Sequence, residues 1–200
     1  MDATVTVGMY VRNARNREEV WLLDHIEEMS LDDAAFRSRD YVIAIDEQNN
    51  EKVGFGRIRI HRDDERVCEL TGIGVLEDWR GQGVGAHVIE RLLDRASDEG
   101  FERVYSLTDE SRYLKQFGFE RRDREDLPAK LDARLVEKRE GSVPDAVPLS
   151  VSIEEFAMPE RLRERFKNAS AAGEESEIEE TPEDFGIDTE NATYKYDTGS

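Results

Sequence analysis

The sequence predicts a single α/β (α+β) domain in which a mixed, mostly antiparallel central sheet is flanked by helices. Three observations lead to this class. Strand-forming runs over 41–45, 53–60 and 67–75 follow one another with only short polar turns between them, as antiparallel strands do. The glycine-rich segment 80–85 comes next and opens an amphipathic helix. Beyond it, short strands alternate with helices.

The N-terminal part is expected to add a strand and a helix before the three-strand run. Weak alternation of apolar residues predicts a strand over 4–12. An apolar stripe at helical spacing predicts a helix over 17–29, with Asn16 as its cap. A short second helix is predicted near 32–36.

The helix after the glycine segment keeps its apolar residues on one face and is expected to end at Gly100. A short central strand is predicted over 104–107. Thr108 is placed to cap a brief helix that ends at Gly118, and a further strand is predicted over 119–121.

The last part of the domain is expected to contain two helices and a strand. Pro128 suits the first residue of a helix that runs to about residue 140, and a strand is predicted over 147–153. A short basic helix follows over 159–167. From residue 169 onward most residues are small or acidic. We therefore expect a folded domain over 1–168 and a flexible acidic tail over 169–200.

The charge balance limits the partners of the protein. The chain has 47 acidic and 28 basic residues, a net charge of −19. This argues against general binding to nucleic acid or to anionic membranes. Because the carboxylates are dispersed along the whole chain, the composition favours a halophile's cytoplasmic protein, in which salt screens self-repulsion. An ordinary acidic protein is the alternative.

Cysteine and histidine usage excludes several kinds of site. The single cysteine, Cys68, cannot form an intramolecular disulfide or a cysteine-based zinc cluster. The three histidines have no metal-ligand spacing, so no metal is expected, and His87 is expected to be solvated on a polar helix face. Cys68 precedes Glu69 on a strand, so the two side chains point to opposite faces and Cys68 is interpreted as a core residue. No signal peptide or membrane span is recognised.

The glycine-rich segment lies between a strand and a helix start. Several backbone N–H groups then point outward beside the positive end of a helix dipole. This geometry suits a phosphate or pyrophosphate.

The order of elements and two motifs resemble the GNAT superfamily of acetyl-CoA-dependent N-acetyltransferases over about residues 4–155. The family's Arg/Gln-x-x-Gly-x-Gly/Ala signature is matched at every defined position by Arg80-Gly81-Gln82-Gly83-Val84-Gly85. A second match is the aromatic-rich segment 113–119, which ends in Gly-Phe. A dinucleotide-binding fold also has such a turn, but there it follows the first parallel strand and not an antiparallel meander.

The resemblance implies acetyl-CoA as co-substrate. The backbone amides of 82–85, with those near Arg80 and Gly81, would bind the pyrophosphate of coenzyme A. A side chain at Gly83 or Gly85 would hold the anion away or strain the turn. The Arg80 side chain would add charge, or would pair with an acidic neighbour. Ile73 and Val75 would line the pantetheine, and the Val75 amide would stabilise the oxyanion.

Glu69 is the candidate general base for the acceptor amine. It lies six residues before Val75, the spacing at which related acetyltransferases have a general-base glutamate. Burial among apolar neighbours is expected to raise its pKa into a useful range. The alternative is a solvent-facing strand residue.

The group that protonates the leaving thiolate is not identified by the resemblance. Many family members have a tyrosine four positions before the Gly of the Gly-Phe pair, and here that position is Leu114. Tyr113 is its neighbour and Tyr105 lies on the preceding strand, but neither matches. Water or coenzyme A itself would then take this role.

The acceptor is expected to be an amino acid or a similar small amine, because three short segments resemble that branch of the family. Arg57 and Arg59 lie on one face of a strand next to that of Glu69 and could clamp an acceptor carboxylate. Solvated arginines are the alternative. Two other functions stay open: a protein or peptide N-acetyltransferase, and a non-catalytic acyl-CoA-binding module. A homodimer is common in the family.

Overall fold

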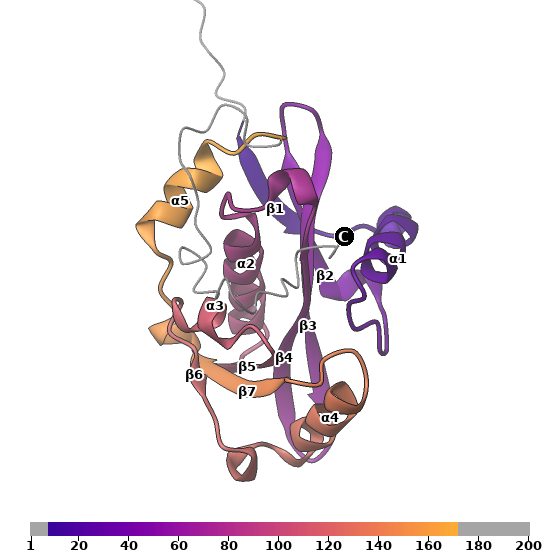
Figure 1. The fold of residues 1–200 in the computed structure, drawn as a ribbon, viewed down its shortest axis with the longest axis vertical. Coiled ribbons are helices and arrows are strands. Elements are labelled where there is room, and N and C mark those ends of the chain that lie inside the picture. Colours follow the sequence, from indigo (N-terminus) through magenta and orange to yellow (C-terminus); the bar gives the residue numbers. More distant parts are fainter. Residues whose placement is uncertain (1–7, 172–200) are drawn as a thin grey trace, which may run out of the picture.

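The computed structural model describes residues 8–171, and within them seven strands form one sheet in the order β1-β2-β3-β4-β5-β7-β6 (Figure 1). Neighbouring strands are antiparallel except β4 and β5, which run parallel. The predicted mixed, mostly antiparallel sheet is therefore confirmed. The strands are β1 Met9–Asn13, β2 Tyr41–Asp46, β3 Glu51–Arg62, β4 Arg66–Val75, β5 Arg103–Thr108, β6 Glu120–Arg121 and β7 Val147–Ser152.

Helices cover both faces of this sheet. Helix α2 covers one face, and Leu162 and Phe166 of α5 pack in the same core cluster. Helices α1 and α4 pack on the other face (Figure 1). The helices are α1 Glu19–Glu28, α2 Val84–Asp98, α3 Ser111–Lys115, α4 Ala129–Glu140 and α5 Glu160–Lys167. Short 3-10 segments lie at Asn16–Glu18, Ser38–Asp40, Glu77–Trp79, Arg124–Asp126 and Ile153–Glu155.

Most elements form where their patterns predict them, but the N-terminal region differs in two details. No helix forms over 32–36. The Arg57 guanidinium binds the carbonyl oxygens of this segment and holds it as a loop. Asn16 does not cap the following helix with its side chain; the Glu18 carboxylate accepts the Arg15 N–H at 2.8 Å. The part of the predicted first strand over 1–7 lies outside the described residues.

The two central strands, β4 and β5, are paired over a short stretch and then separate. β4 and β5 pair only at Glu69–Tyr105 and Leu70–Ser106. Beyond Leu70, β4 contains a bulge in its pairing with β3, and Gly72 adopts a φ of +67° there. A bulge with glycine in this conformation turns the strand. The sheet therefore opens between the end of β4 and the end of β5.

The C-terminal part of the domain continues past the predicted boundary. Ala169 packs against the core cluster, and Ser170 is hydrogen-bonded to Gln82. The rest of the predicted tail, 172–200, lies outside the described residues. Over 8–171, none of the helices is long and apolar enough to cross a membrane.

Candidate active site

The glycine-rich segment forms the turn that enters α2, as the sequence predicts. Gly81 and Gly83 have φ angles of +79° and +76°, a left-handed conformation that glycine adopts without strain. Gly83 is the N-cap residue of the 15-residue helix. The first N–H groups of such a helix have no partner within the helix, so they are available to an anion beside the turn.

The end of β4 directs backbone groups toward the opening in the sheet. The Leu76 N–H donates to the Val53 carbonyl of β3 at 2.9 Å. N–H groups of an antiparallel strand alternate in direction, so the Val75 N–H points away from β3. The Val75 carbonyl points the same way and accepts a hydrogen bond from Arg80 Nε at 3.1 Å. One Arg80 nitrogen is thus used to fix the strand end to the turn.

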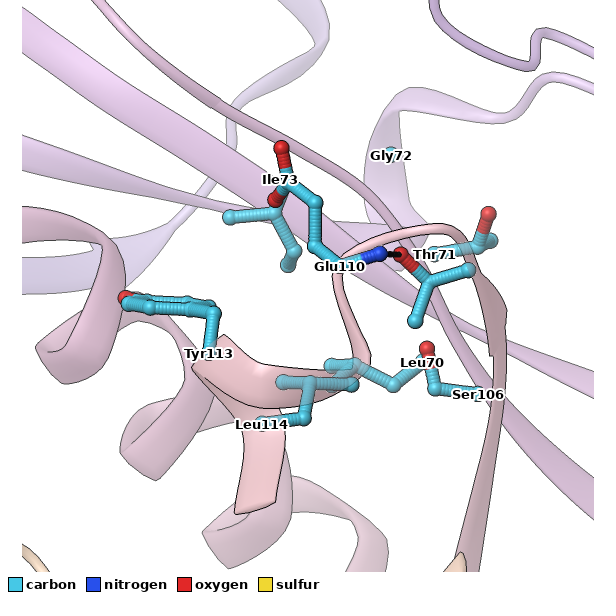
Figure 2. Close-up of a pocket in the computed structure, with 9 residues that line it drawn as sticks. Leu70, Thr71, Gly72, Ile73, Ser106, Glu110, Tyr113 and Leu114 are labelled. Atoms are coloured by element: carbon cyan, nitrogen blue, oxygen red, sulfur yellow. Dashed lines mark hydrogen bonds between the residues drawn. The ribbon is translucent and has the colours of Figure 1, made fainter. Parts of the chain in front are cut away.

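A pocket lies in the opening between the two strands. It is lined by residues 70–73 of β4, by Ser106 and Thr108 of β5, and by Glu110, Tyr113 and Leu114 (Figure 2). The Thr108 hydroxyl accepts the Glu110 N–H at 3.0 Å, but the N-cap residue of α3 is Glu110, so the predicted cap at Thr108 is wrong. The cavity is about 20 Å³, room for about one water. A thioester arm would enter only after side chains of this wall move.

The C-terminal segment packs against the glycine-rich turn, which the sequence did not predict. A Cβ on Gly83 would collide with the Leu162 carbonyl oxygen of α5. The Gln82 side chain forms two hydrogen bonds with the Ser170 backbone, at 2.7 and 2.8 Å. His87 is only 8% exposed and stacks on Phe166 with ring centroids 3.9 Å apart. Its predicted solvation is therefore wrong, and burial lowers its pKa.

Glu69 is fully buried and lies beside one histidine and two cationic side chains. Its carboxylate is 2.9 Å from His61 Nε2, 3.3 Å from Arg134 Nε and 3.4 Å from Lys138 Nζ. Burial alone would raise the pKa of Glu69, but Lys138, His61 and Arg134 together hold it well below its usual range. The expected net rise of this pKa is wrong, because the charges of Lys138 and Arg134 and the hydrogen bond with His61 outweigh the effect of burial.

Two of these groups, Arg134 and Lys138, come from α4, on the same face of the sheet as Glu69. Arg134 and Lys138 are one helical turn apart and are 4% and 6% exposed. Lys138 Nζ also donates to Thr71 Oγ1 at 3.1 Å and to the Leu107 carbonyl at 3.0 Å. Arg134 forms a second ion pair, with Asp32 of the α1–β2 loop. This cluster could not be predicted from the sequence, because a polar stripe on a helix usually faces water.

The comparisons with known proteins agree with this geometry. The sequence model of the acetyltransferase (GNAT) family matches residues 8–119. The chain belongs to this family. An uncharacterized N-acetyltransferase of Chlorobaculum tepidum is 30% identical over 66 residues, which are 33% of this chain and 43% of that protein. The chain thus matches less than half of that relative's length.

Solved structures of GNAT type share the fold at low identity. The Rv2747 protein of Mycobacterium tuberculosis, bound to coenzyme A, has a TM-score of 0.61 at 17% identity, over 72% of this chain and 98% of that one. N-acetylglutamate synthase of Neisseria gonorrhoeae, with coenzyme A and N-acetyl-glutamate, has a TM-score of 0.58 at 15% identity. The match covers 72% of this chain and 35% of that one. Arabidopsis thaliana Naa50, with a bisubstrate analogue, has a TM-score of 0.52 at 18% identity. The match covers 73% of this chain and 99% of that one. Identities this low show a shared fold alone.

The GNAT tyrosine position is held by an apolar residue in this chain. Leu114 and Tyr113 both line the pocket and both are buried, at 4% and 3% exposed. Tyr105 lines a different surface hollow, at the N-terminal part of β5. Of the two tyrosines weighed from the sequence, Tyr113 is the one at the opening.

The two candidate clamp arginines have different environments. They share the face of Glu69, because Arg57 pairs with Thr71 and Arg59 pairs with Glu69 in the sheet. Arg57 is fully buried, and its guanidinium donates to the Ala34 carbonyl at 2.8 Å. It therefore holds the α1–β2 loop. Arg59 is partly exposed and lines an open cleft.

Cys68 lies on the opposite face from Glu69, as predicted. It is 1% exposed within the core cluster that contains α2. Burial raises the pKa of Cys68 to about 12, so the thiol stays protonated at neutral pH. This agrees with its interpretation as a core residue.

Proposed function

We propose that the chain is an acetyl-CoA-dependent N-acetyltransferase that acts on the primary amine of an amino acid or a similar small molecule. The observation that supports this most is that a glycine-rich turn at the start of a long helix lies next to an opening in the sheet. The turn over 80–85 enters α2, and the Val75 N–H points toward the gap that β5 leaves beside β4.

Residues of the turn and of β4 would hold the co-substrate. Backbone N–H groups over 82–85 would bind the pyrophosphate, while Ile73 and Val75 would line the pantetheine arm. The positive φ angles of Gly81 and Gly83 and the long helix behind them fit this role. The α5 carbonyl at Gly83 and the Gln82–Ser170 bonds limit access from one side. Acetyl-CoA binding would therefore require this segment to shift.

The reaction would proceed by direct attack of the amine. A C–N bond forms, the thioester C–S bond breaks, the amine loses a proton and the thiolate gains one. The Val75 N–H would stabilise the oxyanion between these steps. Glu69 as general base stays a prediction. With its pKa held low by Lys138 and Arg134, it would accept the proton only if the acceptor displaces those cations from it.

Binding and turnover test the proposal separately. We expect calorimetry to detect acetyl-CoA binding and thiol release to occur with free amino acids in preference to peptides or polyamines. Turnover only with peptides would favour a protein acetyltransferase instead. Binding without any turnover would favour a non-catalytic acyl-CoA module. The cytoplasmic location, the homodimer and adaptation to high salt stay predictions from the sequence.

Tyr113→Phe tests the protonation of the leaving thiolate. Because Tyr113 lines the pocket at the opening, we expect this variant to lower kcat by about 10² if the hydroxyl is the acid. Tyr105→Phe is the matched control and should leave kcat unchanged, since Tyr105 lies outside this pocket. An equal, small effect of both variants would assign the proton to water or to coenzyme A.

A further inference from the structure

A basic cleft lies on the Glu69 face of the sheet, between the α1–β2 loop, the end of β3 and the start of α4. Its volume is about 650 Å³. Half of its ten lining residues are arginine or lysine: Arg37, Arg39, Arg59, Arg62 and Lys130. Such a concentration of positive charge is unusual in a chain whose net charge is −19.

Only part of this charge is neutralised by the protein. Arg37 pairs with Asp40 at 3.0 Å, and Lys130 pairs with Asp63 at 3.8 Å. Across residues 8–171, the guanidinium groups of Arg39, Arg59 and Arg62 form no ion pair. The cleft therefore carries an excess of positive charge that an anion would balance.

Within this cleft, the Arg59 guanidinium is the group that most needs an anionic partner. Its Nη1 atom is buried and has no hydrogen-bond partner among the described residues. A buried donor without a partner is costly, and a solvated surface arginine does not have one. Burial, with Arg134 nearby, also lowers the pKa of Arg59. If the guanidinium turns this donor toward the cleft, a bound anion would satisfy it and offset both effects.

The cleft adjoins the candidate acceptor site. Its lining residue His61 is hydrogen-bonded to Glu69 through Nε2, and Arg59 is the sheet partner of Glu69. Lys130 of the cleft is one helical turn from Arg134, which contacts Glu69. A molecule in the cleft thus has its inner end beside the Glu69 cluster.

We infer that the acceptor is an anionic amine, whose acid group, a carboxylate or a phosphate, binds Arg59 and Arg39 in this cleft. The amine end then lies toward Glu69 and β4. Guanidinium groups recognise both acid groups through paired hydrogen bonds. This inference rests on the proposed function and narrows it to one class of acceptor.

Matched acceptors test the class. Initial rates of thiol release are compared for β-alanine against β-alaninamide and for O-phosphoethanolamine against ethanolamine, pairs in which only the first member has an acid group. We expect kcat/KM to be about tenfold or more higher for at least one acidic member over its neutral partner. The pair with the larger ratio identifies carboxylate or phosphate as the preferred group. Equal values within both pairs would overturn the inference while leaving the acetyltransferase proposal intact.

Substitutions in the cleft test whether Arg59 and Arg39 bind the acid group. Arg59→Gln and the more exposed Arg39→Gln should raise KM for the acidic acceptor about tenfold, with kcat and the neutral acceptor little changed. Arg66→Gln is the control, because Arg66 is exposed and contacts Glu99 outside the cleft. Both cleft variants behaving like this control would overturn the assignment.

A binding measurement needs no turnover. Glutarate and inorganic phosphate are titrated as probes by calorimetry into the wild type and into Arg39→Gln. We expect at least one probe to bind the wild type and to bind the variant about tenfold more weakly. Absence of binding by both probes, in a protein that binds acetyl-CoA, would reject the cleft as an anion site and not the proposed function.

Discussion

Glu69→Gln is expected to lower the free energy of unfolding at pH 7 by about 3–5 kcal/mol, the cost of breaking a buried ion pair by removing one partner. The carboxylate is fully buried and touches three groups, so glutamine would leave Arg134 and Lys138 without their central anion. Urea denaturation measures the change. Glu120→Gln, at an exposed strand residue, is the control and should stay within about 0.5 kcal/mol of the wild type.

The acid dependence of this difference has a definite sign. The folded protein lowers the pKa of Glu69 below its ordinary value of 4.5. A carboxylate with a lowered pKa contributes its full stabilisation above the unfolded value, and this is lost as the pH falls through the folded value. The difference between wild type and Glu69→Gln should therefore be constant above about pH 5 and shrink in more acid solution. A difference that grows in acid would contradict the ion-pair assignment.

Turnover of the same variant separates two roles of Glu69. We expect kcat to fall by about 10² or more, provided that the variant is assayed where it is still folded. If Glu69 takes the proton of the amine, high pH should relieve the loss, since the amine is then already deprotonated. If Glu69 only holds the α4 cations in place, the loss should persist at high pH. Unchanged turnover would remove Glu69 from the mechanism.

The elements around the glycine turn could be predicted from the sequence because their signals are local. Alternating apolar residues mark the strands before the turn, and one apolar face marks α2. The motif at 80–85 then identifies the turn itself. Each of these features depends on residues only a few positions apart in the chain, so it can be recognised in the sequence.

The environment of the candidate base could not be predicted in the same way. Glu69 and Arg134 are 65 positions apart, and the contact exists only because α4 lies over that face of the sheet. A sequence shows that Arg134 and Lys138 share a helix face, but not that this face is buried. The lowering of the Glu69 pKa depends mainly on that fact. For the same reason Arg57 was expected at the acceptor, whereas it binds loop carbonyls.

Gly83→Ala is expected to destabilise the fold more than Gly100→Ala, although both glycines have positive φ angles, of +76° and +89°. Left-handed backbone costs a residue with a Cβ about 1–2 kcal/mol, and this applies to both positions. Gly100 has open space where the Cβ would lie, whereas at Gly83 the Leu162 carbonyl oxygen is in the way. Overpacking adds about 1–3 kcal/mol there. Thermal and urea unfolding of the two variants measure the difference.

Acetyl-CoA affinity decides why the turn needs glycine at position 83. If the backbone there binds the pyrophosphate, Gly83→Ala should weaken binding by about tenfold or more in calorimetry, because the new Cβ disturbs the N–H groups at the start of α2. Gly100→Ala, at the other end of the same helix, should bind as the wild type does. A Gly83→Ala variant that loses stability but keeps full affinity would show that the glycine serves only the packing of α5, and the pyrophosphate assignment would then be wrong.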